Sequence, residues 1–163
     1  MSITGFLEHI VPTYGNYGGP DYSGGVFVPP GVQPNYDVPS VDDLDALFRL
    51  HDIGSGASTS GERAMADRDL IYGIHALPDD SLTSEGHLWA GAATLAMIAD
   101  IEIRQGQPGV LTPDEVLHFS GEAVQDIAAS GVEPFSNSAI AVQEAAQQAW
   151  SWTSHLGVFD GIF

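Results

Sequence analysis

Apolar side chains recur at every third or fourth position over much of this sequence, which is the spacing of one face of an α-helix. The pattern predicts helices over residues 41–54, 62–77, 84–105, 112–130 and 137–155, and a short one over residues 2–11. The one strand-like run is Val26–Val28, and it is short. We therefore expect an all-α fold.

Two of these helices carry recognisable start signals. Ser40 has the character of an N-cap, with Asp43 three residues later. Thr112 and Glu115 form a capping box, with proline at the first helical position. In the helix that this box opens, we expect Val116, Ala123, Val124 and Ile127 to face inward.

The length of 163 residues fits a single domain, and the chain changes character twice within it. Residues 12–40 contain six prolines and four tyrosines without a helical period, which predicts a long ordered loop. Such a loop inside a compact domain is usually functional or disordered, and the aromatic content here argues for order. Residues 41–77 predict a helix pair joined by the glycine-rich segment 54–61, and residues 84–156 predict additional C-terminal helices.

The composition excludes several kinds of site and partner. The chain has no cysteine, so disulfides and thiolate metal sites are ruled out. With 22 acidic residues against four arginines, the formal net charge is −18, which argues against nucleic acid and anionic membrane surfaces as partners. The same acidity favours cation binding, although a salty habitat would also account for it. Neither a Sec-type signal peptide nor a transmembrane segment is expected.

His51 and Asp67 are each the polar member of an otherwise apolar helical stripe. The stripes are Leu44, Leu47, Phe48 and His51 in the first helix, and Ala64, Asp67, Leu70, Ile71 and Ile74 in the second. A buried carboxylate is costly unless it is paired, and an imidazole N–H is its natural partner. A carboxylate on one ring nitrogen leaves the other nitrogen free as a general base. The alternative is a core histidine that is merely satisfied. The other histidines lack zinc-like spacing, and we expect them to be structural or exposed.

Asp52 follows His51 directly and suggests a metal site. The upstream segment Tyr14-Gly-Asn-Tyr-Gly-Gly-Pro-Asp21 is rich in glycine, which lets backbone carbonyls turn inward. Calcium accepts carbonyl and carboxylate oxygens readily, so this loop and Asp52 together indicate a calcium site. A glycine- and tyrosine-rich surface turn is the alternative.

Taken together, residues 14–75 resemble the secreted, calcium-dependent phospholipases A2. That family has a loop of the form Tyr-Gly-Cys-Tyr-Cys-Gly-x-Gly, which corresponds to Tyr14–Asp21 with both cysteines replaced. Its catalytic helix often reads Val-Asp-Asp-Leu-Asp, five residues, then His-Asp, as Val41–Asp45 and His51-Asp52 do here. A later Cys-Asp-Arg segment of the family resembles Ala66-Asp67-Arg68.

The resemblance implies an antiparallel helix pair with a calcium loop, and a role for each matched residue. His51 would activate a water for hydrolysis of the sn-2 ester of a glycerophospholipid, and Asp67 would support the imidazolium. Calcium would bind the Asp52 carboxylate and the carbonyls of Tyr17, Gly19 and Asp21, while the N–H of Gly19 would assist the oxyanion. The candidates for lining an acyl channel are Phe6, Leu7, Ile10 and Phe48.

Two departures from the family pattern keep other functions open. Asp21 replaces a glycine, and Ser55 stands where the family has a tyrosine bonded to the supporting aspartate, a role for which Tyr36 and Tyr72 are candidate substitutes. A non-catalytic module that binds calcium or a protein partner, and a purely structural helical protein, are the alternatives. For the enzyme we expect a phospholipid partner at a membrane or micelle interface, and an oligomer is compatible with the sequence. The resemblance favours a secreted or translocated protein, with a cytoplasmic one as the alternative.

Overall fold

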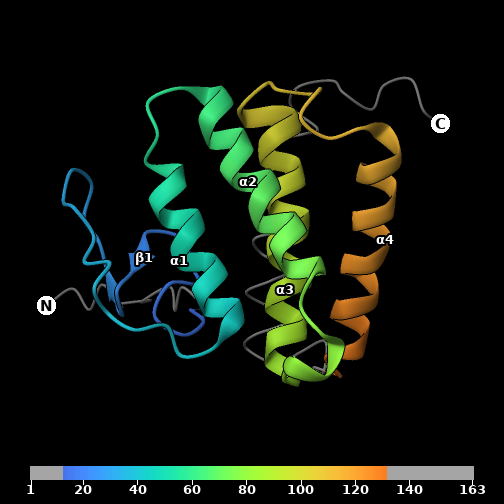
Figure 1. Ribbon diagram of the computed structural model, residues 1–163, viewed down its shortest axis with the longest axis horizontal. Coiled ribbons are helices and arrows are strands. Elements are labelled where there is room, and N and C mark those ends of the chain that lie inside the picture. Colours follow the sequence, from blue (N-terminus) through green and yellow to red (C-terminus); the bar gives the residue numbers. More distant parts are fainter. Residues whose placement is uncertain (1–12, 132–163) are drawn as a thin grey trace, which may run out of the picture.

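The computed structural model describes residues 13–131, and this part of the chain is mostly helical, as expected (Figure 1). In chain order, its elements are β1 (Tyr22–Ser23), β2 (Val26–Phe27), α1 (Asp43–Ser55), α2 (Ser60–His75), the 3-10 helix η1 (Asp79–Ser81), α3 (Ser84–Ala99), the π-helix η2 (Asp100–Arg104) and α4 (Pro113–Ala129). The helices predicted over residues 2–11 and 137–155 lie outside the described residues. None of the described helices combines the length and the hydrophobicity that crossing a bilayer requires.

The four α-helices of the described part all begin at a capping side chain. The capping box at Thr112 and Glu115 is confirmed, and Thr59 and Glu62 form a second one at the start of α2. The prediction for α1 is wrong, because its N-cap is Asp42 and not Ser40. The Asp42 carboxylate accepts the N–H of Asp45 at 2.8 Å, and Asp43 is the first helical residue. The chain stays extended through Asp42 because the preceding N–H of Val41 is held by the Asp45 carboxylate at 2.9 Å.

Helices α1 and α2 run in opposite directions side by side (Figure 1). Two glycines set how closely they approach. A Cβ on Gly54 of α1 would lie 2.7 Å from the Cβ of Ala66, and a Cβ on Gly73 of α2 would lie 2.6 Å from a methyl group of Leu47. Both distances are too short for a side chain, so glycine at these positions permits the close contact of the pair.

The core consists of two clusters that α2 and α3 connect. One contains Tyr14, Tyr17, Leu44 and Phe48, which pack the loop before α1 against the helix pair. The other contains Ile71, Ile101, Leu111 and Phe119, which pack α2 against the end of α3 and the start of α4. Each large apolar side chain buried in this way contributes about 1.5–3 kcal/mol.

The predicted apolar stripes are correct for α2 and partly wrong for α4. All five residues of the α2 stripe are buried. In α4, Ala123 is buried, but Val124 is 58% exposed and Phe119 faces the core. Phe119 and Ala123 are four residues apart and share one face, whereas Val124 is rotated by about 100° from Ala123.

Candidate functional site

The structure brings together His51 of α1 and Asp67 of α2. Nε2 of the imidazole lies 2.7 Å from Oδ1 of the carboxylate. The Asp67 side chain is only 2% exposed and that of His51 is 16% exposed, so the contact lies at the edge of the core. An ionised carboxylate only accepts hydrogen bonds, so the proton resides on Nε2. Nδ1 then carries the lone pair, and it makes no hydrogen bond to any residue between 13 and 131.

Asp67 is contacted on its other side by Gln105, the residue that follows the π-helix η2, rather than by a tyrosine. The amide nitrogen of Gln105 lies 3.5 Å from Oδ2 of Asp67. Burial raises the pKa of Asp67, and the nearby Asp100 carboxylate adds to this rise, whereas the hydrogen bond from His51 opposes it. Asp67 therefore has a second carboxyl group, Asp100, as its neighbour, and the charge of Asp100 disfavours the ionisation of Asp67.

Neither tyrosine proposed as a substitute supports Asp67. The hydroxyl of Tyr72 donates to the Glu115 carboxylate at the start of α4. The hydroxyl of Tyr36 donates to the main-chain oxygen of Asp52 at 3.3 Å. Both side chains are thus committed elsewhere.

Asp52 is a half-buried carboxylate with an unused oxygen. Its Oδ2 atom is enclosed and makes no hydrogen bond of ordinary geometry, nor does the neighbouring buried hydroxyl of Ser23 in β1, which lies near enough to lower the pKa of Asp52. Burial raises the pKa of Asp52 to about 6; Ser23 and His51 act in the opposite direction, and Asp45 adds to the rise. An enclosed acceptor without a donor is what a cation site presents before the cation binds.

The Tyr14–Asp21 loop is fixed to α1 by Asp45, which is fully buried. The carboxylate of Asp45 accepts the backbone N–H of Asn16 at 3.0 Å, of Tyr17 at 2.9 Å and of Val41 at 2.9 Å. Gly15 is required next to it, because a Cβ there would lie 2.3 Å from the Asp45 Cγ. We did not single out Asp45 from the sequence, although its position seven residues before Asp52 places both carboxylates on one helical face.

The three carbonyls proposed as calcium ligands differ in the hydrogen bonds that they already accept. Among the described residues, no group donates to the Tyr17 carbonyl, and Gly19 accepts only a long hydrogen bond of 3.4 Å from Tyr22. The Asp21 carbonyl accepts the N–H of Val28 at 2.7 Å. Asp21 has φ of 53°, the left-handed conformation that favours glycine and that aspartate tolerates.

The proposed acyl channel is only partly within the described residues. Phe48 is 5% exposed and packs edge to face against Tyr14, with ring centroids 6.0 Å apart. It therefore belongs to the core cluster around the loop. Phe6, Leu7 and Ile10 lie outside the described residues.

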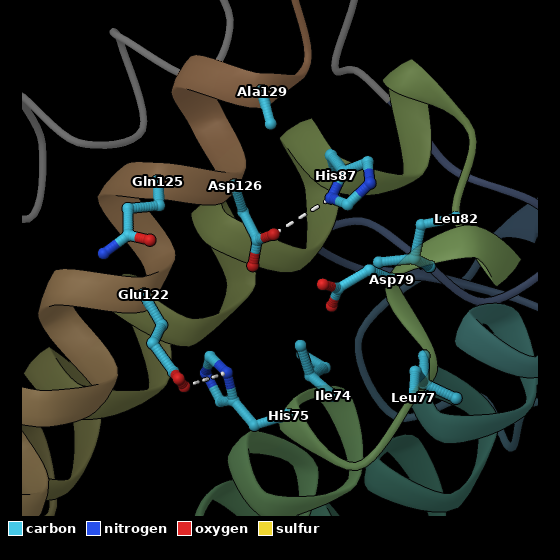
Figure 2. A pocket seen from close by; sticks show the side chains of 10 residues that line it. All are labelled: Ile74, His75, Leu77, Asp79, Leu82, His87, Glu122, Gln125, Asp126 and Ala129. Atoms are coloured by element: carbon cyan, nitrogen blue, oxygen red, sulfur yellow. Dashed lines mark hydrogen bonds and ion pairs between the residues drawn. The ribbon is translucent and has the colours of Figure 1, made fainter.

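A separate pocket of about 410 Å³ lies between α4 and the facing ends of α2 and α3 (Figure 2). Two histidine–carboxylate pairs line it: His75 with Glu122 and His87 with Asp126, each at 2.9 Å. Each pair joins its helix to α4. In the described part of the chain, no three histidine, aspartate or glutamate side chains gather as a metal site. The calcium site considered above would use only one carboxylate, together with backbone carbonyls.

A scan against protein-family models, a search of curated proteins and a search of solved structures each gave no match to this chain.

Proposed function

We propose that this chain is a calcium-dependent hydrolase that cleaves the sn-2 ester of glycerophospholipids. One observation carries the proposal: an imidazole–carboxylate pair at the edge of the core lies directly beside a carboxylate that has one enclosed oxygen without a donor. His51 meets Asp67 at 2.7 Å, and the next residue, Asp52, has an enclosed oxygen without a donor. The resemblance of residues 14–75 to the secreted phospholipases A2 supports the same function.

The chemistry of the pair is general-base catalysis. Nδ1 of His51 takes a proton from a water molecule, and the resulting hydroxide attacks the carbonyl carbon of the ester. Asp67 stabilises the positive charge that the imidazole acquires, and it holds the ring in one tautomer. The imidazolium then returns its proton to the leaving alcohol. The backbone N–H of Gly19 has no hydrogen-bond partner among residues 13–131, so it is free to donate to the oxyanion.

The chemistry of the expected ligands suits a calcium ion. The Asp52 carboxylate and the carbonyls of Tyr17 and Gly19 are the donors best suited to hold it, and Asp21 adds a carbonyl that is already hydrogen-bonded once. These are hard oxygen donors, which calcium prefers. Bound calcium would supply a Lewis acid that attracts the phosphate and polarises the ester carbonyl.

The expected substrate surface follows from the charge of the protein. At a net charge of −18, the chain is repelled by anionic lipid, so zwitterionic or dispersed phospholipid is the better substrate.

The test is the release of fatty acid from phosphatidylcholine, with and without a calcium chelator. We expect chelation and His51→Asn each to abolish release, whereas the exposed His118 of α4 serves as the matched control through His118→Asn. The His51→Asn variant should keep its helical circular dichroism spectrum. Hydrolysis that persists without calcium would contradict the proposal.

A non-catalytic calcium-binding module is the second candidate. The missing tyrosine favours it, because Tyr72 and Tyr36 both bond elsewhere and neither supports Asp67. This candidate predicts that calcium raises the melting temperature while no phospholipid is hydrolysed.

A further inference from the structure

The amide of Gln105 lies between two carboxylates. Its nitrogen, Nε2, lies 2.9 Å from Oδ2 of Asp100 and 3.5 Å from Oδ2 of Asp67. Gln105 is 9% exposed, so water does little to screen the charges of the two carboxylates from each other. A primary amide has two N–H donors, which is the number needed to serve one carboxylate on each side.

The orientation of this amide is determined by its surroundings. Nε of Arg63 donates to Oε1 of Gln105 at 3.3 Å, and the same guanidinium donates to the Ala57 carbonyl at 3.0 Å. If the amide were turned over, its oxygen would face two carboxylates and its N–H₂ would face an arginine. Only the observed orientation satisfies all three partners of the amide, which are Asp67, Asp100 and Arg63.

The π-helix η2 places Gln105 where this contact is made. The N–H of Gln105 bonds to the Asp100 carbonyl, five residues earlier, at 2.8 Å. This wider turn brings the Gln105 side chain next to that of Asp100. Such turns occur frequently at functional sites.

Two of the four arginines of the protein contact the cluster formed by Gln105, Asp67 and Asp100. Arg63 holds the amide oxygen of Gln105, and Arg104 forms an ion pair with Asp100 through both its Nε and Nη2 atoms. In a protein of net charge −18, this arrangement compensates the second carboxylate while His51 remains the partner of Asp67.

We propose that Gln105 is a positioning residue that aims Asp67 at His51, and that Arg63 and the Asp100–Arg104 pair fix Gln105 in place. This rests on the proposed function. In the family pattern a tyrosine bonds to the supporting aspartate, and in this chain the amide of Gln105 would take that role. Without the amide, the neighbouring carboxyl groups of Asp67 and Asp100 would lose the N–H donors that serve them both. Asp67 would then be protonated more readily, and a neutral carboxyl group stabilises the His51 imidazolium less than a carboxylate does.

Gln105→Met tests the inference, because methionine preserves the size of the side chain and removes both donors. Gln107→Met is the matched control: Gln107 lies two residues further on and reaches Ser60 of α2 at 3.3 Å, without contact to Asp67. Kinetics would use a short-chain phosphatidylcholine with calcium. We expect kcat to fall roughly tenfold in Gln105→Met, with KM within about twofold, and both to be unchanged in the control.

A second readout does not depend on activity. The pKa of Asp67, followed by ¹³C NMR of its carboxyl carbon, should rise in Gln105→Met and stay at the wild-type value in Gln107→Met. Gln105→Asn, which withdraws the amide by one methylene, should change the pKa in the same direction and provides the test if the methionine variant does not fold. An unchanged Asp67 pKa in a folded Gln105 variant would overturn the inference. If the wild-type protein hydrolysed no lipid, the proposed function would fail while the Asp67 titration still decided the role of Gln105.

Discussion

The surroundings of Asp52 disfavour its negative charge. Its Oδ2 atom is enclosed without a donor, and burial raises its pKa to about 6. Because this value lies above the ordinary 3.8, the folded protein holds the Asp52 proton more tightly than the unfolded chain does. The contribution of Asp52 to stability therefore falls as the pH rises from about 4 to about 6, and the full cost remains above that range.

Asp52→Asn removes this cost and, with it, the proposed calcium ligand. In thermal unfolding at pH 7 without calcium, we expect the variant to melt at a higher temperature than the wild type. Calcium should raise the melting temperature of the wild type, less so below pH 6 where a proton competes for Asp52, and should not affect the variant. Asp69→Asn, an exposed aspartate of α2, is the control. A calcium response that survived in Asp52→Asn would exclude Asp52 as a ligand.

Asp45 fixes the Tyr14–Asp21 loop through three backbone N–H donors. Asp45→Ala would leave these buried donors unpaired, at a cost of about 1–3 kcal/mol each. We expect the free energy of unfolding in urea to fall by about 3 kcal/mol or more, and the response to calcium to disappear with the loop geometry. Asp37→Ala, at an exposed position of the preceding segment, should change neither quantity. A loss of stability no larger than that of Asp37→Ala would show that the loop is held by other contacts.

The residues of the candidate site differ in how far the sequence could reveal them. His51 and Asp67 each interrupt an apolar stripe, and a stripe faces the core, so their meeting followed from periodicity. Gln105 could not be found in this way. Its contact with Asp67 depends on a π-turn and on the packing of α2 against the end of α3, neither of which leaves a periodic signal.

At the scale of the helices, glycine determines how closely α1 and α2 pack. Gly54→Ala would place a methyl group 2.7 Å from the Cβ of Ala66, and neither group can rotate away. Because the helices must separate to relieve this contact, we expect a loss of about 1–3 kcal/mol in stability and a longer distance between His51 and Asp67. Hydrolysis should fall together with stability.

The matched control is Gly121→Ala in α4, where a Cβ would meet no atom within 4 Å. This variant should be more stable by about 0.5–1 kcal/mol, because alanine has the higher helix propensity. Urea unfolding of both variants gives the comparison. If Gly54→Ala were as stable as Gly121→Ala, close packing at Gly54 would be unnecessary.

The start of a helix could be predicted where the capping signal is local in the sequence. The prediction was wrong where the cap depends on residues outside the helix. The capping box at Thr112 uses residues three positions apart and is independent of the rest of the fold. Ser40 has the same capping chemistry, but its hydroxyl makes no hydrogen bond, and Asp42 caps α1 while Asp45 joins the preceding segment to the helix. This arrangement involves the loop, so the sequence of the helix alone did not reveal it.

At the scale of the whole molecule, α4 is attached to the other helices through histidine–carboxylate pairs, which makes the attachment sensitive to pH. His75 of α2 meets Glu122 at 2.9 Å and stacks on Phe119, with ring centroids 4.8 Å apart. Burial lowers the pKa of His75, to which His118 contributes, while Glu122 and Asp126 oppose the change. The folded protein therefore resists protonation of His75 more than the unfolded chain does.

The sign of the resulting pH dependence is opposite to that of Asp52. Below the ordinary histidine pKa of 6.5, the unfolded chain binds a proton that folded His75 resists, so this contribution to stability is present above 6.5 and is lost as the pH falls.

His75→Gln removes the titration of this residue. Between pH 7 and 5, we expect the free energy of unfolding of this variant to fall less than that of the wild type. Urea unfolding at several pH values measures the slope, with the wild type as the reference, because His118 contacts the same Glu122 carboxylate and is not an independent control. Lowering the pH also relieves repulsion in a chain of net charge −18, but this effect is common to both proteins, so the difference between them isolates His75. Equal slopes in the variant and the wild type would mean that His75 does not couple α4 to pH.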